Sequence, residues 1–158
     1  MLFGRQSRHV KRILIVEDEP LVAFDNETMV AAAGYTVVAT VDRVSDALAV
    51  LARELAPAGE DEETDDRGVD LILTDLSLTG ERTGLDLAIE ARALGVPVLF
   101  ATANPPDSGE GQALGVLIKP YNERRLRAAL KTVERLFAGK SNIDPPEGMI
   151  LYPPVLSA

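Results

Sequence analysis

The chain has 158 residues and a formal net charge of −9, from 16 basic and 25 acidic residues, and it contains no cysteine. This length suits one domain with a sizeable core, and an apolar content of 46% is too high for a disordered protein. The lack of cysteine excludes disulfides and thiolate chemistry, and the acidity argues against nucleic acid as a partner. Any bound metal is therefore expected to be a hard cation with oxygen ligands.

Segments that would target the chain to a membrane are not evident. The longest charge-free stretches, residues 28–41 and 93–106, are too short to cross a bilayer. The apolar run near the N-terminus, residues 13–16, is too short for the core of a signal peptide. We therefore expect a cytoplasmic protein without membrane insertion.

Five short runs of strand-forming residues alternate with helical patterns along the chain. The expected strands cover residues 12–16, 36–41, 69–75, 96–101 and 115–118. The expected helices cover about residues 20–33, 43–56, 84–94 and 121–138. Residues 103–114 would hold a further helix, but two prolines and two glycines make it short or irregular.

This alternation indicates an α/β fold with a parallel sheet. Most of the strands are continuous apolar runs, which is typical of strands covered by helices on both faces. Five such units fit a flavodoxin-like doubly wound sheet of order 2-1-3-4-5, in a three-layer α/β/α arrangement. Ligands bind such sheets beyond the carboxyl ends of the strands, so the polar residues at those ends form the candidate site.

Charged and hydroxyl side chains stand at the carboxyl ends of four of the expected strands: Glu17, Asp18, Asp75, Thr102 and Lys119. Three carboxylates at one sheet edge would repel one another unless Lys119 and a divalent cation, best Mg²⁺, neutralised them. Asp75 could then act as a nucleophile that forms an aspartyl phosphate. Lys119 and Thr102 could stabilise the oxygens of the transferred phosphoryl group.

Four motifs in this order resemble the receiver domain of two-component response regulators, over about residues 11–138. They are Ile-Leu-Ile-Val-Glu-Asp-Glu-Pro at 13–20, Leu-Ile-Leu-Thr-Asp-Leu-Ser-Leu at 71–78, Leu-Phe-Ala-Thr at 99–102 and Leu-Ile-Lys-Pro at 117–120. The resemblance implies that Asp75 is the phosphoacceptor and that the Lys119–Pro120 peptide bond is cis. It also implies a Mg²⁺ site made by Asp18, Asp75, the main-chain carbonyl of Ser77 and, through water, Glu17.

The Phe-Ala-Thr sequence at 100–102 also resembles the FAT GUY subgroup of alphaproteobacterial single-domain response regulators. Ala103 stands where that subgroup has glycine, and Val116 stands where typical receivers have a tyrosine or phenylalanine that reorients on phosphorylation. We therefore expect phosphorylation to order the segment after Thr102 rather than to turn an aromatic ring. Ala103, Val116, Pro120 and Tyr121 are the candidate switch or partner surface.

The resemblance implies a single-domain response regulator with a basic tail at 1–10, a receiver at 11–138, a proline-rich tail at 139–158 and no output domain. Its function would be to accept phosphate from a histidine kinase or phosphotransfer protein, then to signal by protein contact, relay the phosphate or drain it. It would not be an enzyme beyond slow self-phosphorylation and autodephosphorylation. The C-terminal tail is either draped on the domain or disordered, or it is an apolar docking segment. The oligomeric state stays open.

Other protein classes fit less well. A haloacid-dehalogenase-type phosphatase needs a second aspartate at the position of Ser77, and a nucleotide binder needs a phosphate-cradling loop where residues 17–19 are all acidic. The remaining alternative is a degenerate receiver that binds partners without being phosphorylated.

Overall fold

The computed structural model of the chain describes residues 9–57, 67–106 and 112–153. Most of the basic N-terminal tail, the acidic run at 60–66 and the last five residues lie outside these ranges. The expected helix over 103–114 lies partly outside them. Its described parts, residues 103–106 and 112–114, form no helix.

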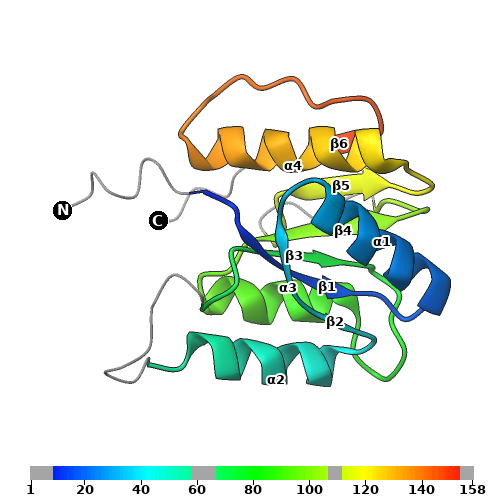
Figure 1. Ribbon diagram of the computed structural model, residues 1–158, viewed down its shortest axis with the longest axis vertical. Coiled ribbons are helices and arrows are strands. Elements are labelled where there is room, and N and C mark those ends of the chain that lie inside the picture. Colours follow the sequence, from blue (N-terminus) through cyan, green and yellow to red (C-terminus); the bar gives the residue numbers. More distant parts are fainter. Residues whose placement is uncertain (1–8, 58–66, 107–111, 154–158) are drawn as a thin grey trace.

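A mostly parallel six-stranded sheet lies at the centre of the fold, with the strand order β2-β1-β3-β4-β5-β6 (Figure 1). The strands are β1 (Arg12–Val16), β2 (Thr36–Val41), β3 (Leu71–Thr74), β4 (Val98–Thr102), β5 (Gly115–Ile118) and β6 (Met149–Leu151). The first five pair in parallel, so the expected order 2-1-3-4-5 is confirmed.

The sixth strand was not expected. β6 comes from the proline-rich segment after the last helix and pairs antiparallel with β5, with Val116 opposite Ile150. Gly115 permits this pairing, because a Cβ at that position would lie 2.1 Å from the carbonyl oxygen of Ile150. Three apolar residues are too short a pattern to predict a strand.

Helices cover both faces of the sheet, as expected for three layers (Figure 1). α1 (Pro20–Ala32) and α4 (Glu123–Phe137) pack on one face, and α2 (Val44–Leu55) and α3 (Gly84–Ala93) pack on the other. The buried stripe of α4 follows the helical period and includes Leu126, Leu130 and Val133. Among the described residues, no helix is both long and apolar enough to span a bilayer.

Two strands differ from their expected bounds, and the differences decide where Thr102 and Asp75 stand relative to the strand ends. β4 covers 98–102 rather than 96–101, because Pro97 has no N–H to donate to a neighbouring strand. β3 is shorter than 69–75, and the Asp70 carboxylate before it accepts from the main-chain N–H groups of Lys11 and Arg12, both at 2.9 Å. Thr102 therefore ends β4, and Asp75 directly follows β3.

Candidate functional site

Three carboxylates meet at the carboxyl end of the sheet. Glu17 and Asp18 follow β1, Asp75 follows the adjacent parallel strand β3, and the Asp75 N–H donates to the carbonyl of Val16 at 3.0 Å. One carboxylate oxygen from each acid lies within 4.8 Å of the other two. The topology therefore brings together acids that are more than fifty positions apart in the sequence, as the strand-end pattern predicts.

Lys119 partly neutralises this cluster from the end of β5. Its Nζ lies 2.6 Å from Glu17 Oε1 and 2.7 Å from Asp75 Oδ2. Burial of the ammonium works to lower the pKa of Lys119, but the hydrogen bonds and charges of Asp75 and Glu17 outweigh it and raise that pKa. Burial raises the pKa of Glu17, although Lys119 offsets part of the effect. The lysine is therefore held charged between two acids.

The backbone around Asp75 is fixed by the start of α3. The N–H of Ser77 donates to Asp75 Oδ1 at 3.2 Å, and the N–H of Gly84 donates to the carbonyl of Leu76 at 2.9 Å. A Cβ at Gly84 would lie 2.1 Å from the carbonyl oxygen of Asp75, so only glycine fits. Gly84 was not among the residues expected from the sequence, because a glycine at a helix start carries no sign of what it packs against.

Hydrogen bonds also orient the other two acids. The hydroxyl of Thr79, in the connection between β3 and α3, donates to Asp18 Oδ2 at 3.0 Å. The N–H of Glu19 donates to Glu17 Oε2 at 3.1 Å. Thr79 was also not expected from the sequence, since its bond to Asp18 depends on how the connection between β3 and α3 folds.

Thr102 lies beside Lys119 at the ends of neighbouring strands. The carbonyl of Thr102 accepts from the N–H of Lys119 at 2.9 Å, and its hydroxyl accepts from the N–H of Asn104 at 3.2 Å. Thr102 is buried, so its hydroxyl is held in place rather than free in solvent. The structure thus brings the hydroxyl and the ammonium to the same edge as the acids.

The four candidate switch residues do not share one surface. Ala103 and Pro120 are exposed, whereas Val116 is fully buried and offers nothing for a partner to touch. Tyr121 is partly buried, and its hydroxyl donates to Asn26 Oδ1 on α1 at 2.6 Å. Burial and the nearby acids raise the pKa of Tyr121. The Lys119–Pro120 peptide bond is cis, as the resemblance implies.

The donor set fits a hard divalent cation. Three carboxylates converge and, among the described residues, one ammonium is paired with them, so negative charge remains for a cation to neutralise. Carboxylate oxygens are the ligands that Mg²⁺ prefers. The N–H of Ser77 donates to Asp75 Oδ1, and the role of its main-chain carbonyl as a metal ligand stays a prediction.

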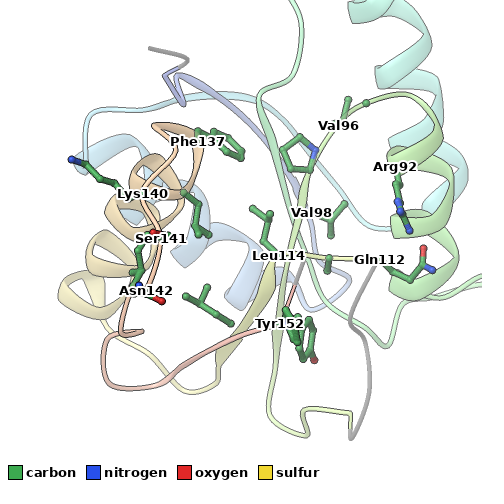
Figure 2. Close-up of a pocket in the computed structure, with 17 residues that line it drawn as sticks. Arg92, Val96, Val98, Gln112, Leu114, Phe137, Lys140, Ser141, Asn142 and Tyr152 are labelled. Carbon is green, nitrogen blue, oxygen red and sulfur yellow. The ribbon is translucent and has the colours of Figure 1, made fainter. Parts of the chain in front are cut away.

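A cavity of about 840 Å³ lies at the other end of the sheet (Figure 2). The residues before and at the start of β4 and β5, including Val98 and Leu114, form one side of it, and Phe137 and Tyr152 also line it. None of the residues of the acidic cluster lines this cavity, so it is separate from the strand-end site.

The fold and this cluster agree with the comparisons to known proteins. The sequence model of one protein family, the response regulator receiver domain, matches residues 13–131. The chain belongs to that family.

Individual relatives give the same picture. The chain is 31% identical over 122 residues to the phyllosphere-induced regulator PhyR of Methylorubrum extorquens, a match that covers 75% of this chain and 41% of that protein. The chain therefore spans less than half the length of this relative. A CheY-like receiver domain protein from Methanospirillum hungatei superposes with a TM-score of 0.65 at 21% identity, covering 82% of this chain and 98% of that one. The anti-anti-sigma factor PhyR from Bartonella quintana superposes with a TM-score of 0.60 at 23% identity, covering 87% and 52%.

Proposed function

We propose that Asp75 accepts a phosphoryl group from a histidine kinase or a histidine phosphotransfer protein, in a Mg²⁺-dependent reaction. The observation that carries this proposal is the pairing of Lys119 Nζ with Asp75 at 2.7 Å inside a cluster of three acids. This arrangement joins a nucleophile, a metal-binding site and a cation for the phosphoryl oxygens in a chain of the receiver family.

In the proposed transfer, a carboxylate oxygen of Asp75 forms a bond to phosphorus while the P–N bond of the donor phosphohistidine breaks. The electron pair of that bond returns to the imidazole nitrogen. Lys119 turns from the carboxylates to the phosphoryl oxygens and neutralises their charge, and Thr102 donates a hydrogen bond to another oxygen. The chain acts as a phosphoacceptor rather than an enzyme, with slow self-phosphorylation and autodephosphorylation at most.

Asp18, Asp75 and the main-chain carbonyl of Ser77 would hold Mg²⁺ directly, and Glu17 would act through water. When bound, the ion neutralises charge on the acids and on the transferred group. Thr79 keeps the Asp18 carboxylate turned toward the cluster, since its hydroxyl donates to one of the two oxygens. Glu17 is the buried member of the cluster, and Lys119 pairs with its carboxylate.

The phosphodonor protein would contact the start of α1. Leu21 and Phe24 lie three positions apart on this helix and are 76% and 67% exposed. Neighbouring exposed apolar side chains are suited to a protein interface. Because α1 begins just after Asp18, a protein bound there lies next to Asp75.

The phosphorylated chain would then act through a protein partner, pass the phosphate on, or drain it. Similarity to PhyR, which in Bartonella quintana is an anti-anti-sigma factor, supports a protein partner for this chain too. The alternative is a degenerate receiver that binds its partner without phosphorylation.

Phosphorylation of the full chain by acetyl phosphate tests the proposal. We expect phosphorylation in Mg²⁺, seen on phosphate-affinity gels and by intact mass, and its loss in EDTA or in Asp75→Asn. Asp42→Asn is the matched control, since Asp42 directly follows β2, and it should be phosphorylated like the wild type. Undiminished phosphorylation of Asp75→Asn would contradict the site assignment. A folded wild type that neither acetyl phosphate nor any host kinase phosphorylates would favour the degenerate receiver.

A further inference from the structure

A buried polar side chain lies on the inner face of α1. Asn26 is only 2% exposed, and Val30, one turn further along the same helix, belongs to the apolar core. A buried amide without a hydrogen-bond partner is costly, so its partner is structurally significant. That partner is the hydroxyl of Tyr121, which donates to Asn26 Oδ1 at 2.6 Å.

Tyr121 belongs to the four-residue connection between β5 and α4, which also contains Lys119. At its start, the N–H of Lys119 donates to the carbonyl of Thr102 at 2.9 Å. At its end, Asn122 caps α4 by accepting from the N–H of Arg125 at 2.9 Å. The bond from Tyr121 to Asn26 holds the middle of the connection against α1.

We propose that Tyr121 is a positioning residue for Lys119 and that Asn26 is its anchor on α1. The lysine side chain is a flexible four-carbon stem, so its ammonium can be aimed only if the backbone from which it starts is fixed. Tyr121 is two residues from Lys119, and its bond to Asn26 ties that stretch of backbone to α1. This inference rests on the proposed phosphorylation of Asp75.

Tyr121→Phe tests the role directly, because it keeps the ring and removes only the hydroxyl. With acetyl phosphate, a small donor that needs no docking to α1, we expect the phosphorylation rate to fall about tenfold. Mg²⁺ binding without a donor should be unchanged, since neither Tyr121 nor Lys119 is a proposed ligand of the ion.

A double-mutant cycle separates positioning from a general loss of structure. In a Lys119→Ala background, Tyr121→Phe should not slow the residual phosphorylation further. The pair Asn26→Leu with Tyr121→Phe replaces both hydrogen-bonding groups with apolar ones of similar shape. It should therefore melt near the wild type and still be phosphorylated slowly.

Three results would overturn the positioning role. They are a wild-type rate in Tyr121→Phe, a wild-type rate in the apolar pair, or an equal slowing by Tyr121→Phe with and without Lys119. As long as the wild type is phosphorylated, these results would reject only the role of Tyr121, and the proposed role of Asp75 would stand. A wild type that is not phosphorylated at all would instead remove the proposed function, and this inference with it.

Discussion

The two ends of the central sheet differ in chemistry. At the carboxyl end, three carboxylates and Lys119 converge from the ends of β1, β3 and β5. At the amino end of β4 and β5 lies the cavity of about 840 Å³, and none of the described residues that line it is Asp or Glu (Figure 2). This cavity is thus not where the reactive groups meet. In a parallel sheet, strand direction decides which loops converge, and it identifies the site better than cavity size does.

The largest effect should come from Lys119→Ala, which removes the cation from the carboxyl end. Glu17 and Asp75 then face each other without a counter-charge, and Glu17 is buried. We expect the metal-free protein to lose roughly 1–3 kcal/mol of its free energy of unfolding, measured by urea denaturation. Phosphorylation by acetyl phosphate should fall at least about tenfold, because the phosphoryl oxygens lose their cation.

Mg²⁺ should still bind to the Lys119→Ala variant and recover part of the lost stability, since the acids remain. A variant that is phosphorylated at the wild-type rate would show that the ammonium has no part in the chemistry of this end.

Substitutions at two glycines can perturb the two ends of the central sheet separately. At either Gly84 or Gly115, a Cβ would lie 2.1 Å from a backbone oxygen, that of Asp75 in one case and that of Ile150 in the other. Gly84→Ala and Gly115→Ala should therefore each cost about 1–3 kcal/mol in the free energy of unfolding. Only Gly84→Ala should also slow phosphorylation, because it displaces the backbone of the phosphoacceptor.

The comparison requires both variants to be folded, which circular dichroism can show. Equal slowing of phosphorylation in the two variants would mean that the two ends of the sheet are coupled. The strand-end site would then not be independent of the amino end.

The smallest effect should come from the cavity. Ile143→Ala removes part of one wall, and Ile143 is only partly buried, so we expect a loss of roughly 1 kcal/mol or less in stability. Its phosphorylation rate and Mg²⁺ affinity should match those of the wild type. A change in either, measured in parallel with Gly84→Ala, would connect the cavity to the strand-end site.

The sequence was informative where a local pattern carries the signal. Continuous apolar runs identified the parallel strands, and the polar residue after each run identified Glu17, Asp18, Asp75 and Lys119. These predictions need only the direction of the strands, because the topology then fixes which ends meet.

Contacts between distant segments could not be predicted in this way. Gly84 matters because the start of α3 approaches the carbonyl of Asp75, and Asn26 matters because Tyr121 reaches it from another part of the chain. β6 pairs with β5 because Gly115 leaves room for it. In each case the deciding quantity is a tertiary distance, which no spacing along the sequence contains.

The central claim is that the phosphoryl group is carried by the carboxylate of Asp75. Borohydride reduces an acyl phosphate at the modified aspartate, so treatment of the phosphorylated chain followed by peptide mass mapping locates the group. We expect one reduced residue, at position 75, and none when Mg²⁺ is chelated. Reduction at another acid of the cluster, such as Asp18, or label that resists borohydride would contradict it.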